Sequence, residues 1–187
     1  RFFMPDSNIT KNALASALKG LMKRKPFSKI SVRDICEECG MNRKSFYYHF
    51  KDKYDLVNWI FYVDFVSEIT VGSYDNGWEL LVALCDLFYN DREFYHDALM
   101  IEGQNSFRDY FYETLQPLVK FFIQDIFNDS QEQEFFTVFV VEGFLATMVR
   151  WLSDDQDTTP RRFLSQIRDV ILALAASLKD DMEQTDE

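Results

Sequence analysis

The sequence predicts an all-α protein with a small three-helix head at its N-terminal end and a larger helical body. Three observations lead to this prediction. The 187 residues include 19 Phe but only 6 Gly and 4 Pro, a composition that favours helices over a turn-rich β protein. Apolar residues recur with helical spacing in successive segments, and no stretch alternates as a half-buried strand would. Short polar or glycine-containing breaks separate these segments.

The head is predicted to begin with two helices. Thr10 is a suitable N-cap for the first, which ends before Pro26 because proline disfavours helical dihedrals at the preceding residue. Its apolar positions follow helical spacing: Ala13, Leu14, Ala17, Leu18, Leu21 and Met22. The second helix is predicted to start at the N-cap Ser31, with Asp34 at the N3 position, and to end at Gly40 as a C′ glycine.

A third helix, residues 42–50, completes a predicted helix-turn-helix whose turn is Gly40-Met41-Asn42. On a helical wheel, Phe46 and Phe50 share the inner face, whereas Lys44 and Tyr48 point outward. The exposed face of this helix is therefore predicted to be cationic, hydroxylated and aromatic.

Asp52 is predicted to cap a long helix that runs through about residue 70. After a break at residues 72–77, the body is predicted to contain further helices at about 78–89, 91–101, 105–127, 131–152 and 160–179. Breaks at 128–130 and 153–160 separate the last three. The predicted domains are residues 1–55 and residues 56–187.

Charge is divided unevenly between the two predicted domains. The whole chain carries a formal charge of −11, yet residues 1–60 contain 12 basic and 6 acidic side chains, and residues 61–187 contain 8 and 25. A basic head on an acidic body is typical of a protein whose head alone meets a polyanion. Arg, Lys, Tyr and Ser side chains on the third helix suit the base edges and phosphates of duplex DNA. The alternative is a solvated helix face that is basic by chance.

The segment SKISVRDICEECGMNRKSFYYHFKDKYDL resembles the DNA-binding head of TetR/AcrR-type transcriptional regulators. The likeness lies in Ile35-Cys36, in Gly40 at the turn, in the run Tyr47-Tyr48-His49-Phe50, and in Lys53 at the start of the next helix. The stretches YHFKDKYDLVNWIFY and IEGQNSFRDYF are also similar to a subgroup that includes regulators of dihydroxyacetone-kinase operons.

The resemblance implies a DNA-binding role for matching positions. The implied base or groove contacts are Arg33, Arg43, Lys44 and Ser45. The implied phosphate contacts are Asn42, Tyr47, His49 and Lys53, and Tyr48 suits either role. Lys44 departs from the small residue that is common in the family, so no operator sequence is carried over.

The resemblance further implies a homodimer, in which the last two helices pair with their two-fold mates as a four-helix bundle. Such a dimer would bind a pseudo-palindromic operator in double-stranded DNA. Repression is the default expectation, and the effector is an unknown small molecule or a partner protein acting on the body. The alternatives are a transcriptional activator that responds to a partner protein, and a helical ligand-binding or adaptor protein without DNA binding.

No catalytic or metal site is predicted. The chain has no Walker loop, GxGxxG or GxSxG, so we expect neither an enzyme nor a cofactor. The CxxC formed by Cys36 and Cys39 suggests a zinc or thiol site, but packing is the preferred interpretation because a second CxxC is absent. Without a signal-peptide pattern or a full membrane span, the expected location is the cytoplasm, with no membrane partner. Effector-binding residues stay unassigned.

Overall fold

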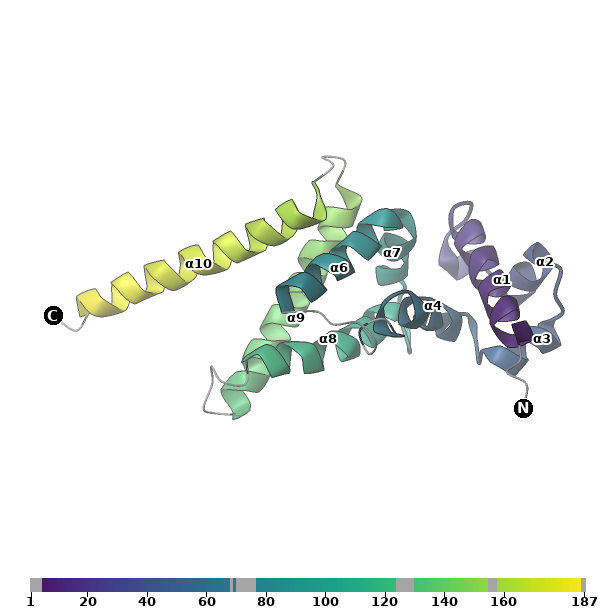
Figure 1. Cartoon of the computed structure of the whole chain (residues 1–187), viewed down its shortest axis with the longest axis horizontal. Coiled ribbons are helices and arrows are strands. Elements are labelled where there is room, and N and C mark those ends of the chain that lie inside the picture. The colour runs from purple at the N-terminus through teal and green to yellow at the C-terminus, as the bar shows by residue number, and fades with distance from the viewer. Residues whose placement is uncertain (1–4, 68, 70–76, 124–129, 155–157, 186–187) are drawn as a thin grey trace.

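The computed structural model describes residues 5–67, 69, 77–123, 130–154 and 158–185. The described residues form helices and no strand, which confirms the predicted all-α class (Figure 1). The head holds α1 (Pro5–Met22), the short 3-10 turn η1 (Phe27–Lys29), α2 (Val32–Glu38) and α3 (Arg43–His49). The body holds α6 (Gly77–Asn90), α7 (Arg92–Leu99), α8 (Phe107–Ile123), α9 (Ser130–Ser153) and α10 (Pro160–Thr185). Between them lie α4 (Lys53–Phe61) and the π turn η2 (Tyr62–Val66).

The predicted signals at both ends of α2 are confirmed. Ser31 and Asp34 form a reciprocal capping box at the start of α2. At its end, Gly40 has a positive φ of 69°, and the Met41 N–H donates to the Cys36 carbonyl oxygen at 2.8 Å. This is the pattern in which a left-handed residue satisfies the last carbonyls of a helix, and only glycine adopts it without strain. The turn therefore leads directly into α3.

One predicted boundary is wrong, and one predicted α-helix contains a π turn. Thr10 does not cap the first helix, because α1 already begins at Pro5, and proline is favoured in the first turn of a helix. The long helix capped by Asp52 is not a continuous α-helix, since it changes to the π turn η2 at Tyr62. A π turn inserts one extra residue into the helix, and this insertion does not detectably change the spacing of apolar residues within a segment of five. The predicted breaks at 72–77 and 128–130, and the predicted end of the helix at 127, lie largely outside the described residues.

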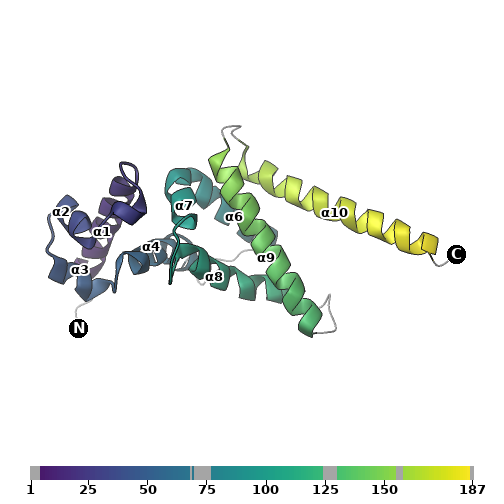
Figure 2. The ribbon, with the colours of Figure 1, turned by 180° about the vertical axis from the view of Figure 1, so that it is seen from behind.

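The last two helices differ from the rest in how they are packed. Only the first turns of α10 pack on the body, through Phe163 and Leu164, and the helix then extends away from it (Figures 1 and 2). In α9, the stretch Gln131–Ser153 is long and apolar enough to cross a membrane by length and composition, although core helices pass the same test. Part of its apolar surface is buried in the core, including Val141 and Leu145.

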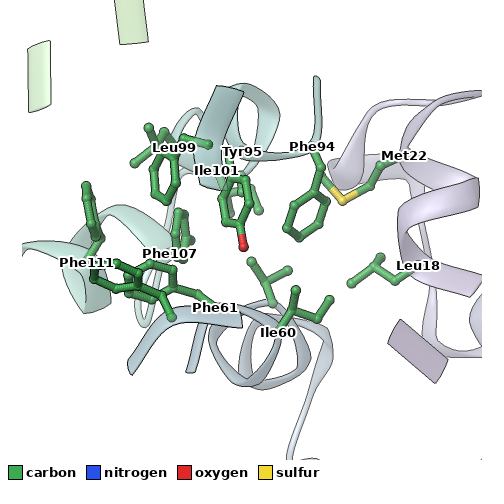
Figure 3. Close-up of a cluster of buried hydrophobic side chains, with 14 of the residues drawn as sticks. Leu18, Met22, Ile60, Phe61, Phe94, Tyr95, Leu99, Ile101, Phe107 and Phe111 are labelled. Atoms are coloured by element: carbon green, nitrogen blue, oxygen red, sulfur yellow. The ribbon is translucent and has the colours of Figure 1, made fainter. Parts of the chain in front are cut away.

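An aromatic cluster joins the elements around the connecting helix. Phe61 of α4 is fully buried, and its ring lies 5.3–6.4 Å from the rings of Phe65, Phe88, Tyr95, Phe107, Tyr110 and Phe111. Figure 3 shows that this core continues into the head, where Leu18 and Met22 of α1 approach Phe94 and Ile60. The head and body thus share one apolar core, which fixes the head against the body.

Candidate nucleic-acid interface

The exposed face of α3 is cationic and aromatic, as the sequence predicted. Phe46 is fully buried and Phe50 is 3% exposed, so these two rings anchor the helix to α1 and α4. On the opposite face Tyr48 is 77% exposed and Tyr47 is 51% exposed. Arg43 and Lys44 in the first turn of the helix are also exposed. The helix α3 is therefore oriented so that the predicted residues face solvent.

The N-terminus of α3 is fixed by Asn42, whose side-chain oxygen accepts a hydrogen bond from the Ser45 N–H at 2.9 Å. Asn42 is therefore occupied as a cap, although its amide N–H groups stay available as donors. Ser45 is half-buried beside it, at the edge of the exposed face.

Arg43 and Tyr47 form a pair one helical turn apart. The Arg43 Nη2 group donates to the Tyr47 hydroxyl oxygen at 3.2 Å, and the guanidinium lies 5.7 Å from the centre of the Tyr47 ring. The hydroxyl accepts in this contact, so its own proton is still free to be donated to a phosphate oxygen. The pair holds both side chains on the outer face of α3.

His49 lies at the end of α3 and is half-buried. Its ring makes an edge contact with the Tyr48 ring, with centroids 4.8 Å apart. Burial, and then the nearby charge of Lys11, lowers the pKa of His49 below its ordinary value of 6.5. The imidazole is therefore neutral at pH 7, and it still carries one N–H donor.

Arg33 lies outside α3, on the exposed side of α2. Its Nε donates to Glu37 Oε1 at 2.7 Å within the same helix. This contact leaves the two Nη groups for other partners. Arg33 is thus accessible, but its guanidinium is partly neutralised before any ligand arrives.

The Lys53 side chain is held within the head. Its ammonium donates to the carbonyl oxygens of Phe27 and Ile30 at 2.7 and 2.8 Å, and it lies 4.2 Å from the centre of the Phe27 ring. Two of its three N–H donors are therefore occupied, and burial lowers its pKa. The sequence placed Lys53 correctly at the start of α4 but could not reveal which way its side chain points.

Cys36 and Cys39 pack within the head. Cys36 is buried, and the Cys39 Sγ lies 3.3 Å from the Ile35 carbonyl oxygen. Burial raises the pKa of both thiols, which keeps them protonated at neutral pH. They behave here as small apolar residues.

The sequence did not reveal a polar cluster that links the head to the body. The Lys19 ammonium of α1 lies 3.3 Å from Asp64 Oδ2 and 2.8 Å from Asp91 Oδ2. The Tyr95 hydroxyl of α7 donates to the same Asp64 oxygen at 3.1 Å. We refer to Lys19, Asp64, Asp91 and Tyr95 as the head–body cluster. A charged residue inside the apolar stretch YVDFV was the only available signal.

Comparisons with known proteins agree with this geometry. Residues 14–60 match the profile described as bacterial regulatory proteins, tetR family, and residues 75–173 match a transcriptional regulator C-terminal region. The HTH-type dhaKLM operon transcriptional activator DhaS of Lactococcus lactis subsp. lactis (strain IL1403) is 30% identical over 102 residues, which are 54% of this chain and 54% of that protein. The match thus spans about half the length of each.

Solved structures show the same architecture over most of the chain. A structure described as the dihydroxyacetone kinase operon activator DhaS has a TM-score of 0.64 at 25% identity, covering 89% of this chain and 96% of that one. A TetR transcriptional regulator from Streptococcus agalactiae 2603V also has a TM-score of 0.64, at 21% identity, covering 86% and 92%. The profiles and structures that the chain matches are those of transcriptional regulators. The N-terminal match contains the whole helix-turn-helix, and the C-terminal match covers more than half of the chain. The chain therefore belongs to the TetR family of bacterial regulatory proteins.

Proposed function

We propose that the protein acts as a homodimer that binds a pseudo-palindromic operator through two copies of α3. The observation that carries this proposal is the outer face of α3, where Arg43, Lys44, Tyr47 and Tyr48 are exposed together on a helix anchored by buried phenylalanines. Side chains in the first turn of such a helix reach base edges in the major groove. The basic head attracts the duplex, while the acidic body is kept away from it.

We propose individual roles for the site residues, and the side-chain geometry supports them. We assign base or groove contacts to Arg33, Arg43, Lys44 and Ser45. We assign phosphate contacts to Asn42, Tyr47 and His49, with Tyr48 in either role. Lys53 receives a positioning role instead, because its ammonium is occupied by the η1 loop. We retain the division into a head of residues 1–55 and a body of residues 56–187, with α4 extending from one into the other.

Exposed apolar residues on the last two helices favour the homodimer. On α9, Phe135 is 76% exposed and Phe139 is 70% exposed. On α10, Val170, Ile171 and Leu172 are exposed on the part of the helix that extends from the body. An apolar surface of this extent is costly in water, and a two-fold partner would cover it. Two heads in such a dimer would need to meet major-groove segments about 34–36 Å apart.

The sign of regulation is proposed from the relatives. Both matches named DhaS are described as activators, which favours activation over the repression that the sequence alone suggested as a default. We further propose that an effector at the body alters DNA binding, and that the protein acts in the cytoplasm, where its DNA is.

The proposal is tested by selecting bound sequences from a random duplex pool with the full-length protein. We expect an enriched inverted repeat, two protomers per duplex by light scattering, and an affinity that falls steeply with salt, by about 0.9 log units per log unit of salt for each phosphate neutralised. Reporter transcription with and without the protein then gives the sign. Recovery of no sequence motif, or binding by single protomers to half-sites only, contradicts the proposal.

A further inference from the structure

The C-terminal end of α9 is held by an arginine of another helix. Arg92, the first residue of α7, is half-buried, and its Nε and Nη2 groups donate to the Leu152 carbonyl oxygen at 3.2 and 3.0 Å. The same Nη2 group donates to the Asp154 carbonyl oxygen at 2.6 Å. The last carbonyl groups of a helix have no partner within it, and the helix dipole favours a cation beside them. Arg92 therefore fixes the point at which the chain leaves α9.

Trp151 holds the start of α10 from the same end of α9. Its buried ring stacks on the Phe163 ring of α10, with the centroids 4.5 Å apart and the two planes within 7° of each other. Its indole Nε1–H donates to the Thr158 carbonyl oxygen at 2.7 Å, just before α10 begins. The Tyr89 ring of α6 also stacks on Trp151, at 5.8 Å. A hydrogen bond and stacked rings therefore attach the first turn of α10 to α9 and α6.

Contacts with α6 continue this attachment along the next turn of α10. Ile167 packs against the core, and the Arg168 guanidinium lies 5.4 Å from the centre of the Trp78 ring of α6. Beyond this point α10 extends away from the body (Figures 1 and 2). The direction of α10 is thus determined by contacts within one chain, before any partner binds.

Small changes of this direction are amplified along the helix. From Pro160 to Leu172, α10 rises by about 18 Å, at about 1.5 Å per residue. A change of about 10° in its direction would therefore move Leu172 by about 3 Å. The exposed apolar residues of α10 would shift by this amount relative to those of α9. In the proposed dimer the partner covers both groups of residues, so the partner and its head would shift with them.

A shift of this size is comparable with the geometry of one base pair. Successive base pairs lie about 3.4 Å apart along the duplex. Each is also rotated by about 35° from the last, because one helical turn contains about 10–10.5 base pairs. A dimer of fixed shape can therefore match only one spacing of its two half-sites. A dimer in which α10 moves relative to the body can follow half-sites that are displaced by one base pair.

We propose that Arg92 and Trp151 set the direction of α10, and that this direction determines which half-site spacing the dimer accepts. This inference rests on the proposed function, because it requires two heads on one duplex. Arg92 and Trp151 are positioning residues, which act through α10 and contact neither bases nor phosphates. The specificity of the protein then has two sources: α3 reads the bases of each half-site, and these two residues select the distance between half-sites.

The inference is tested with the full-length protein on the inverted repeat recovered from the random duplex pool. Two further duplexes have one base pair inserted or removed between the half-sites. We expect either change to raise the Kd of the wild-type protein at least about tenfold, the equivalent of one mismatched base pair. Arg92→Met removes all three hydrogen bonds to the end of α9 and should reduce this rise to less than about threefold, because preorganisation is lost. Trp151→Phe keeps a ring against Phe163 but loses the bond to Thr158, and it should give an intermediate rise.

The ratio of Kd values between spacings distinguishes positioning from a loss of stability. A variant that is merely less stable binds every duplex more weakly by the same factor, so its ratio does not change. Arg108→Met is the matched control, because it removes a guanidinium that pairs with Glu142 in the middle of α9 and leaves the contacts of Arg92 and Trp151 intact. It should retain the wild-type ratio. Circular dichroism measures folding and light scattering the mass, and Trp151→Phe decides the test if Arg92→Met does not fold.

The outcomes separate this inference from the proposed function. If the wild-type protein selects no inverted repeat, the proposed function fails and this inference fails with it. If the wild-type protein binds the repeat but accepts all three spacings equally, only this inference is wrong. The same conclusion follows if the folded variants keep the wild-type ratio, or if Arg108→Met loses it as well. A folded variant that is monomeric also overturns the inference, because the residue then controls association and not spacing.

Discussion

The ammonium group of Lys53 donates a hydrogen bond to the carbonyl oxygen of Phe27 at 2.7 Å. With a second bond to Ile30 at 2.8 Å, it connects the first turn of α4 to the loop between α1 and α2. Both carbonyls belong to the short segment that follows α1, where the Phe27 carbonyl also accepts the Ile30 N–H at 3.0 Å. One side chain thus joins α4 to the η1 segment of the head.

Replacement of Lys53 by methionine should therefore destabilise the protein. The substitution removes two charge-assisted hydrogen bonds but keeps the apolar stem, so we expect a loss of about 1–3 kcal/mol in the free energy of unfolding. DNA affinity should fall to a similar extent on all duplexes. Urea denaturation measures the first effect and duplex binding the second. Lys51→Met, at an exposed lysine nearby, should leave stability within about 0.5 kcal/mol of wild type.

Phe61 is expected to be among the most sensitive core positions. Its fully buried ring contacts six other aromatic rings from η2, α6, α7 and α8. Phe61→Ala should reduce the free energy of unfolding by about 3–5 kcal/mol, because it leaves a cavity among side chains from several helices. Tyr62→Ala, at a neighbouring exposed position, should cost much less. Equal losses in the two variants would mean that this cluster does not stabilise the body.

The second and third helices of the head could be predicted from sequence almost to the residue, because short-range rules determine them. Each signal at Ser31, Asp34, Gly40 and Asn42 depends on a hydrogen bond or a backbone angle within three or four positions. The same is true of the inward Phe46 and Phe50, whose spacing fixes the face they occupy. These local features do not depend on how the remainder of the chain packs.

Contacts between distant segments could not be predicted in this way. Lys19 meets Asp64 across 45 positions, and Lys53 meets Phe27 across 26. Nothing in the sequence near either lysine distinguishes it from one that faces solvent. The π turn also could not be predicted from sequence. Its five residues are too few for the spacing of apolar side chains to distinguish an α-helix from a helix with slightly more residues per turn. The part of the molecule that links body to head therefore emerges only from the packed structure.

DNA affinity is predicted to rise as the pH falls below neutral, through His49. The pKa of His49 lies below 6.5 in the free protein because burial and Lys11 disfavour its charged form. A neighbouring phosphate favours that form, so the pKa must rise in the complex. The complex then binds more protons than the free protein, and affinity should increase as the pH falls, by up to about tenfold per pH unit for each of the two His49 side chains in the dimer. Binding titrations from pH 7.5 to 5.5 measure this slope, and His49→Gln should abolish it.

Dimer formation is predicted to depend on the exposed apolar residues of α9 and α10. Phe139→Glu and Ile171→Glu each place a charge on a surface that a partner would bury, so each should convert the dimer to monomers at micromolar concentration. Light scattering after size-exclusion chromatography measures the mass. Both positions are exposed in the single chain, so circular dichroism and helix content should not change. Dimers that persist in both variants would place the interface elsewhere.

Sequence preference is predicted to depend on Lys44, the outward cation in the first turn of α3. Lys44→Ala should relax selection at one base pair of each half-site by about 1–3 kcal/mol, if its ammonium donates to a base edge as the proposed function assigns. Lys23→Ala makes the same charge change at the end of α1 that faces Glu93 and Asp97 of α7, away from the proposed DNA surface. It should therefore leave the selected motif unchanged. Repeating the duplex selection with each variant compares the two. Lys44 would instead contact a phosphate if Lys44→Ala lowered the affinity for all duplexes equally and left the motif unaltered. In that case the slope of log affinity against log salt concentration should be smaller in magnitude by about 0.9.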